Sequence, residues 1–153
     1  MTEAHLPFTM DAMQTLQHWT LPLRTLLSQT RAATNLRPRV AVIGVGQTLR
    51  GDDAAGLAVV KRLHAAESVL ILEGGSAPEN LTGALRAFAP QIVLLIDAAQ
   101  LGLESGAVRW LDAQAIGGLS ASTHSLPLSL LTLYLQDAFQ CTVGLIAIQM
   151  GQN

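Results

Sequence analysis

Three polar residues have the side-chain chemistry of a metal site, and each stands next to an apolar run of the sequence. Asp53 follows a glycine-punctuated loop, Asp97 directly follows the run QIVLLI, and His124 precedes a second apolar stretch. Two carboxylates and one imidazole suit a borderline divalent ion such as nickel or zinc. Three protein ligands also leave a coordination position open, as a catalytic or transiently recognised metal requires. The residue types therefore indicate a small metal-recognising site.

Each of these residues also has an ordinary structural interpretation. One aspartate of the pair Asp52 and Asp53 could cap the following helix, although a cap needs only one carboxylate. Asp97 could form a turn by bonding to its own backbone, or it could face a partner or a metal, because a buried unpaired carboxylate is costly. His124 could be a structural hydrogen-bonding residue. Their wide spacing leaves these interpretations open.

The elements that would position this site alternate between strand and helix. Short apolar runs predict strands, and intervening amphipathic segments predict helices, one of which opens with a capping box over residues 76–79. The strands are expected at residues 39–45, 68–72, 91–96, 107–111 and 142–149, and the helices near residues 10–30, 53–66, 76–88 and 126–136. This order predicts a three-layer α/β fold, a mostly parallel twisted sheet with helices on both faces. Ligands of such folds bind beyond the carboxyl ends of the strands, where Asp53 and Asp97 are expected.

Composition narrows the function classes. The chain has 153 residues, 50% of them hydrophobic, and a formal net charge of -2 without a Lys/Arg cluster. We therefore expect one compact domain, no nucleic-acid partner and no insertion into a membrane, since the longest apolar runs are too short to span a bilayer. Cys141 is the single cysteine, which excludes an intrachain disulfide and fits a cytoplasmic location. We see no secretory signal at the start of the sequence.

Other catalytic motifs are incomplete. The run that begins Gly44-Val45-Gly46 lacks the third glycine of a dinucleotide fingerprint, and neither a phosphate-binding loop nor a HExxH zinc motif is present. Ser125 adjoins His124 without a nucleophile elbow, and Cys141 precedes a buried strand, where a core position is expected. A nucleotide-binding domain is therefore the weaker alternative.

Four motifs resemble the maturation endopeptidases of NiFe hydrogenases. They are residues 42–56 (VIGVGQTLRGDDAAG), 73–80 (EGGSAPEN), 94–98 (LLIDA) and 123–128 (THSLPL). The order and spacing are those of the family, and the likeness is greatest to the branch that serves the formate-linked, hydrogen-evolving type. The resemblance covers about residues 39–149.

The resemblance implies an α/β fold and a specific reaction. Such endopeptidases remove a short C-terminal tail from the hydrogenase large-subunit precursor after nickel insertion. Asp53, Asp97 and His124 match the family's metal-contacting positions, and the nickel arrives with the precursor. These three residues are then expected both to contact metal and to act in catalysis, by a metal-assisted, aspartate-type hydrolysis. No bound cofactor other than this substrate nickel is implied, and the oligomeric state is left open.

The sequence also departs from the family pattern. Gln47 stands where asparagine is usual, Ala54 stands where glycine is usual, and the chain ends earlier than the family pattern predicts. The expected organisation is an N-terminal amphipathic helix and connector over residues 1–38, followed by the protease-like domain over residues 39–153. The N-terminal helix is expected to cover an apolar face of the sheet. The alternative function is a non-catalytic relative that binds the precursor or metal without cleavage.

Overall fold

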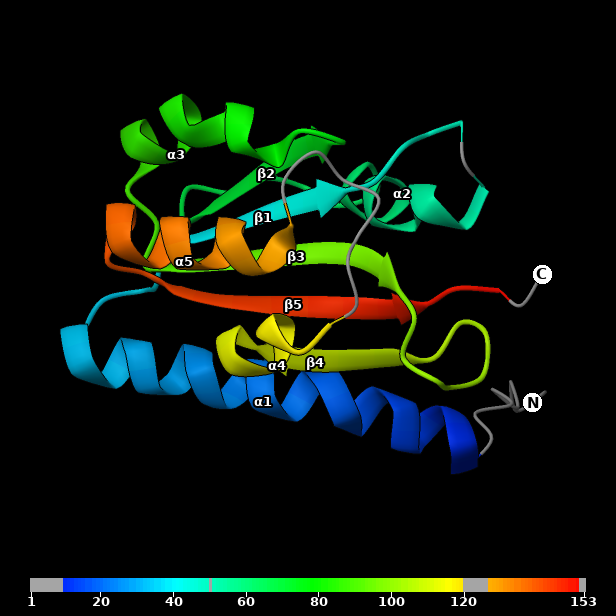
Figure 1. Ribbon diagram of the computed structural model, residues 1–153. Coiled ribbons are helices and arrows are strands. Elements are labelled where there is room, and N and C mark those ends of the chain that lie inside the picture. The colour runs from blue at the N-terminus through cyan, green and yellow to red at the C-terminus, as the bar shows by residue number, and fades with distance from the viewer. Residues whose placement is uncertain (1–9, 50, 120–126, 152–153) are drawn as a thin grey trace, which may run out of the picture.

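A five-stranded sheet forms the centre of the computed structural model, which describes residues 10–49, 51–119 and 127–151, with side chains from His18 onward. The strands are β1 (Val40–Val45), β2 (Val69–Gly75), β3 (Ile92–Ala99), β4 (Val108–Asp112) and β5 (Thr142–Gln149). Their order across the sheet is β2-β1-β3-β5-β4 (Figure 1). All neighbours run parallel except β4, which is antiparallel to β5 at one edge. The predicted mostly parallel sheet is confirmed.

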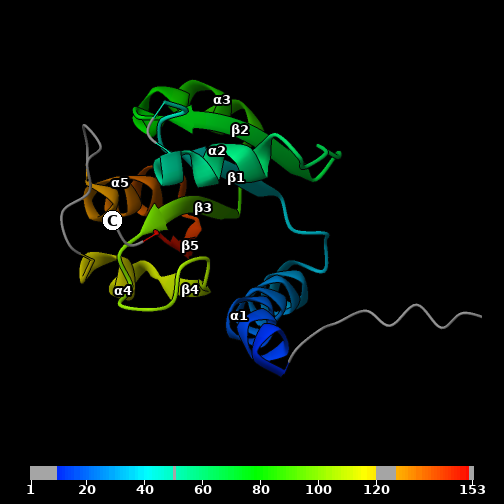
Figure 2. The same ribbon diagram turned by 90° about the vertical axis from the view of Figure 1, so that its right-hand side faces the viewer.

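Helices cover both faces of this sheet, as predicted. The helices α1 (Met10–Thr34) and α2 (Ala55–Val60) lie on one face, and α3 (Thr82–Phe88), α4 (Ala113–Gly117) and α5 (Leu128–Phe139) lie on the other (Figure 2). Two 3-10 turns, η1 (Gly51–Ala54) and η2 (Pro78–Leu81), precede α2 and α3. No helix in the described part of the chain is both long and apolar enough to cross a membrane.

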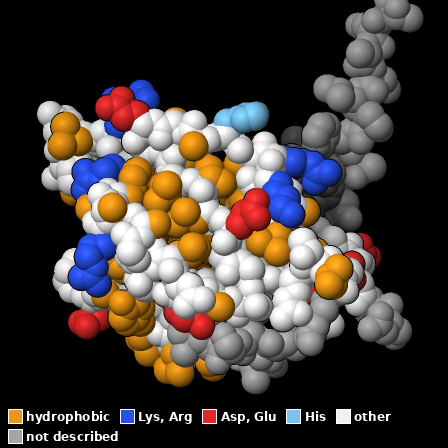
Figure 3. Space-filling view, turned by 90° about the horizontal axis from the view of Figure 1, so that it is seen from above, with side chains coloured by type: hydrophobic (Ala, Val, Ile, Leu, Met, Phe, Trp, Pro, Cys, Tyr) orange, Lys and Arg blue, Asp and Glu red, His pale blue; other side chains and the backbone are white. Residues whose placement is uncertain are grey.

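The burial of the strands follows their place in the sheet. Every residue of the inner strand β1 is buried, and so are the first five residues of β3, as their unbroken apolar runs predict. The sixth residue of β3, Asp97, is buried as well. None of the residues of the edge strand β2 is fully buried. Viewed from the side where β2 and α3 lie, the molecule shows hydrophobic side chains over the middle of this face (Figure 3).

Several local expectations differ from the structure. The strand β3 continues through Ala99, so Asp97 lies within the strand and not beyond its end. The prediction that Ser76 caps a helix as part of a capping box is wrong, because Ala77 occupies the N-cap of η2. The helix expected from residue 53 is shortened to α2, since the two aspartates belong to η1. The helix α4 was not predicted, and Asp112 caps it by accepting a hydrogen bond from the Ala115 N–H (2.8 Å).

The N-terminal helix α1 lies along the β4 edge of the sheet (Figure 1). Its Leu23, Leu26 and Leu27 pack against the apolar cluster that also contains Trp110 of β4 and side chains of the inner strands. The spacing of three and four residues places these leucines on one side of the helix. This packing agrees with the expected role of the helix as a cover, while the division of the chain at residue 38 stays a prediction.

We expect removal of residues 1–36 to lower the melting temperature, because it exposes the apolar surface under α1. The substitution Leu27→Ala should remove about 1–2 kcal/mol of unfolding free energy, since the side chain is partly buried. Leu21, which is 64% exposed on the same helix, is the matched control, and Leu21→Ala should change the free energy by less than about 0.5 kcal/mol. Thermal unfolding measures the melting temperature of the truncated chain, and urea unfolding measures the free energies of the two substituted proteins. An unchanged transition in the truncated chain would contradict the assigned role of α1.

Candidate functional site

The carboxyl edge of the sheet is shaped by a close approach between α2 and two strands. A Cβ atom on Gly56, at the start of α2, would collide with the carbonyl oxygens of Ile96 in β3 and Val45 in β1. A Cβ atom on Gly44 would in turn meet the Gly56 carbonyl oxygen at 2.6 Å. Backbone therefore packs directly on backbone here, which only glycine permits. The contact fixes the turn before α2 against the ends of β1 and β3.

Gly46 completes this arrangement at the exit of β1. Its φ of +133° is a conformation that L side chains rarely adopt, and a Cβ would overlap the Asp53 carbonyl oxygen. The Gly46 N–H donates to the Gly75 carbonyl at 2.9 Å, and the Gln47 N–H donates to the Asp53 carbonyl at 3.2 Å. The loop is thus tied both to β2 and to η1. Ala54 has φ −85°, which any L residue adopts, so its departure from the family glycine imposes no backbone strain.

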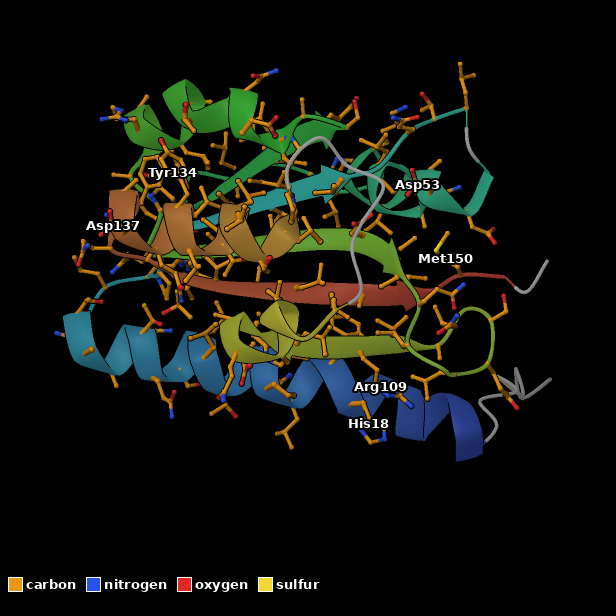
Figure 4. All side chains as sticks on the ribbon, in the orientation of Figure 1. His18, Asp53, Arg109, Tyr134, Asp137 and Met150 are labelled. Carbon is orange, nitrogen blue, oxygen red and sulfur yellow. The ribbon has the colours of Figure 1, made fainter. Side chains whose placement is uncertain are left out.

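Asp53 is held inside this turn. It is only 8% exposed, and its Oδ2 atom is buried without a hydrogen-bond partner among the described residues. Figure 4 shows it at the edge toward which the parallel strands run. The interpretation of Asp53 as a helix cap is not supported, because α2 has Ala54 at its N-cap and no side-chain cap bond. A buried carboxylate oxygen with no donor is costly, and it is rare enough to need a functional explanation.

Asp97 belongs to the neighbouring inner strand. It is 1% exposed and pairs in register with Ala147 of β5. The turn η1 contacts β3, so Asp53 and the strand that carries Asp97 meet at the same edge of the sheet. Strand alternation directs Asp97 toward the face of Val93 and Leu95, which is the face that α5 covers.

The third predicted residue, His124, lies outside the described residues. Within residues 10–49, 51–119 and 127–151, no group of three His, Cys, Asp or Glu side chains is placed to hold a metal ion. The structure thus brings two carboxylate-bearing segments together, and the contribution of His124 stays a prediction. The helix α5, which follows His124 in the chain, begins at Leu128.

Asp52 has a different task from its neighbour. It is exposed, and its Oδ2 atom accepts a hydrogen bond from the Gly151 N–H at 2.7 Å. This bond joins η1 to the segment that leaves β5, and a Cβ on Gly151 would meet the same oxygen at 2.6 Å. One aspartate of the pair therefore fastens the turn, and the other is buried at the sheet edge.

Gln149 organises the loop that follows β3, a role that no sequence motif indicated. It is 3% exposed, and its Oε1 accepts hydrogen bonds from the Leu101 N–H (2.7 Å) and the Leu103 N–H (3.2 Å). Its Nε2 donates to the Gln100 side chain at 2.9 Å and to the Met150 carbonyl at 3.0 Å. A lone polar residue at the end of the apolar run TVGLIAIQ was the available signal.

A groove of about 310 Å³ opens at the β1 exit loop, next to the turn that carries Asp53, because the Gln47 N–H on its wall donates to the Asp53 carbonyl. It is lined by residues of the β1 exit loop, of α2 and of the end of β2, namely Gly46, Gln47, Thr48, Leu49, Leu57, Gly75 and Ser76. Gln47, which stands where the family usually has asparagine, therefore lies on the wall of this groove. Leu49 is 96% exposed at its rim. The groove gives a ligand access to the carboxyl edge of the sheet.

Cys141 is a core residue, as predicted. It is buried, and its Sγ donates to the Leu135 carbonyl oxygen at 3.4 Å. Burial raises the pKa of the thiol above its usual value, which disfavours the thiolate form that acts as a nucleophile. Cys141 stands at the opposite end of the parallel strand β5 from the carboxyl edge.

The fold and site define an α/β protein with a pair of buried carboxylates at the carboxyl edge of its sheet. A family model described as HycI, hydrogenase maturation protease, matches residues 57–153. The hydrogenase 3 maturation protease of Escherichia coli K12 is 35% identical over 103 residues, which cover 65% of this chain and 64%, just under two thirds, of that protein. A candidate hydrogenase maturation protease of Methanocaldococcus jannaschii is 30% identical over 121 residues, with 72% of each chain covered.

Solved structures of hydrogenase maturation proteases are also similar to this chain. The NiFe-hydrogenase maturation protease HycI of Thermococcus kodakarensis KOD1 superposes with a TM-score of 0.66 at 34% identity, covering 76% of each chain. The endopeptidase HycI of Escherichia coli superposes with a TM-score of 0.63 at 33% identity, covering 72% of each chain. This chain belongs to the family of NiFe-hydrogenase maturation proteases.

The glycine contact that positions Asp53 can be tested by adding a single methyl group. Gly56→Ala should destabilise the fold by more than about 3 kcal/mol, because the new Cβ meets two carbonyl groups that cannot yield without moving the strands. The control is Gly83→Ala in α3, where a Cβ meets nothing within 4 Å, and it should stabilise by up to about 1 kcal/mol. Urea unfolding compares the two. Equal effects of both substitutions would contradict the proposed backbone contact.

Proposed function

We propose that this chain is an endopeptidase that removes the C-terminal tail of a NiFe-hydrogenase large-subunit precursor after nickel insertion. Family membership supports the reaction class, and one observation on the site supports the chemistry. The Asp53 Oδ2 atom is buried at the carboxyl edge, next to the strand of Asp97, without a donor among the described residues. A cation delivered by the substrate would satisfy this oxygen. The motifs favour a hydrogenase of the formate-linked, hydrogen-evolving type.

In this proposal nickel belongs to the substrate and is recognised by Asp53, Asp97 and His124. Carboxylate and imidazole ligands suit nickel, and a set of three leaves positions for ligands from the precursor. His124 precedes α5, which packs on the sheet face toward which Asp97 is directed. The three residues would then test whether the precursor is loaded before its tail is cut.

The chemical step needs an attacking group, and we assign it to water. Nickel carried by the precursor supplies Lewis-acid polarisation of the scissile carbonyl or lowers the pKa of the attacking water. Asp53 and Asp97 would orient that water, and one of the two carboxylates would take its proton and pass it to the amine that leaves when the C–N bond breaks. The groove beside Asp53 would hold the adjacent peptide. The buried thiol of Cys141, in the core away from the carboxyl edge, has no role in this scheme. The proposed reaction is cytoplasmic, as the single cysteine led us to expect.

Single substitutions separate the proposed site from its surroundings. Asp53→Asn, Asp97→Asn and His124→Ala should each slow tail removal from nickel-loaded precursor by at least about a hundredfold, because each removes a metal-contacting group. Asp52→Asn is the matched control, since an asparagine Oδ1 can still accept the Gly151 N–H, and it should retain cleavage within about threefold. The mass of the precursor before and after incubation measures cleavage, and circular dichroism checks folding.

Two results would contradict the assignment in different ways. Normal cleavage by all three site variants would exclude these residues from the reaction. If the unaltered protein binds the precursor but never changes its mass, with and without nickel, the chain is instead a non-catalytic relative.

A further inference from the structure

The edge strand β2 exposes a row of backbone groups that no neighbouring strand uses. Among the described strands it pairs with β1 alone, in the register Val40↔Val69 to Gly44↔Glu73 and, past a bulge, Val45↔Gly75. On its outer side the Val69 N–H donates to the Ala66 carbonyl (3.1 Å), and the Ala66 N–H donates to the Val69 carbonyl (3.0 Å). Alternate residues of a strand direct their backbone groups to the same side, so Ile71 and Glu73 also face outward. No backbone bond from the described part of the chain reaches them.

The side chains of β2 make this edge suitable for binding an extended peptide. Val69 and Ile71 join the apolar cluster under α2, and Leu70 and Leu72 join the cluster under α3 and α5. All four are only partly buried, and hydrophobic side chains are exposed on this side of the molecule (Figure 3). An added strand with apolar residues would extend both faces of the sheet at once.

The edge also leads to the proposed reaction centre. The strand β2 ends at Gly75, which lines the groove beside Asp53 together with Ser76 and the exposed Leu49. The Gly75 carbonyl accepts the Gly46 N–H, so the end of β2 is fastened to the loop that holds Asp53. A peptide paired with β2 would reach this groove at the Gly75 end of the strand.

We infer that the outer edge of β2 binds the C-terminal region of the large-subunit precursor as an additional β-strand. This inference rests on the proposed function and names the surface that delivers the tail to Asp53 and Asp97. The backbone of the tail pairs with Ile71 and Glu73, and its apolar side chains cover the two faces next to β2. The stretch of β2 between Val69 and Gly75, whose outward groups are free of the Ala66 bonds, accommodates an extended segment of about five residues at about 3.3 Å per residue. Recognition of this kind depends on an extended, apolar tail more than on a fixed sequence.

Hydrogen exchange tests the pairing in the unaltered protein. Upon addition of excess NiFe-hydrogenase precursor, the outward amides of Ile71 and Glu73 should exchange at least about tenfold more slowly, because they gain carbonyl acceptors. The same precursor without its tail is the control and should leave both amides unchanged. If tailed precursor is cleaved while both amides exchange as in the free protein, the docking inference is wrong and the proposed function stands. If tailed precursor is neither bound nor cleaved, both are wrong.

A matched pair of substitutions tests the same contact through kinetics. Proline is tolerated on an edge strand where its nitrogen faces outward, so Ile71→Pro removes the outward donor, and Ile71→Ala removes the same side chain but keeps the donor. Relative to Ile71→Ala, Ile71→Pro should raise KM for the precursor about five- to tenfold and leave kcat within about twofold. Equal KM values would overturn the inference. Protection of β2 that rises with protein concentration in the absence of precursor would instead assign this edge to a second copy of the chain, which also overturns it.

Discussion

The contact between the backbone of α2 and the ends of β1 and β3 is the constraint on which the site depends. Gly44 and Gly56 let the helix approach until carbonyl oxygens of Val45 and Ile96 lie where a side chain would otherwise stand. The turn η1, which carries both aspartates, is thereby pressed against the carboxyl edge. Asp53 is buried because of this close approach, since a carboxylate has no preference of its own for an apolar environment.

Other hydrogen bonds stiffen the same edge from the outside. Asp52 ties η1 to the segment after β5, and Gln149 ties that strand to the loop after β3. Three chain segments far apart in the sequence are thus fixed around two buried carboxylates. Rigid surroundings are what a recognition site for a metal-bearing substrate requires, because a carboxylate free to rotate toward water would lose its selectivity. The unpaired edge of β2 supplies the complementary feature, a surface ready to accept an extended chain.

The sequence predicted the sheet and the edge on which the site lies. The run that became β1 is apolar throughout, β3 is apolar up to Asp97, and β5 is apolar between Thr142 and Gln149. Burial between helices leaves these runs few alternatives. The rule that ligands bind at carboxyl ends of parallel strands then selected Asp53 and Asp97 as candidates, and their role in the site stays a prediction.

The remaining features depend on which segments become neighbours, which local patterns do not contain. The bond between Asp52 and Gly151 joins residues 99 positions apart, and the need for glycine at position 56 arises only when β3 lies beneath it. The position of Asp97 within β3 follows from pairing with β5, since Ala99 still faces Gln149. His124 lies outside the described residues, so its part in the site rests on the sequence motif alone.

The central claim is that Asp53 and Asp97 contact nickel that arrives with the precursor. Nickel K-edge X-ray absorption tests it most directly, with nickel-loaded precursor measured alone and frozen in complex with this protein. We expect additional oxygen or nitrogen ligands around nickel in the complex, and fewer of them when the protein carries Asp53→Asn. Identical spectra for free and bound precursor, in samples where the complex is shown to form, would contradict the account.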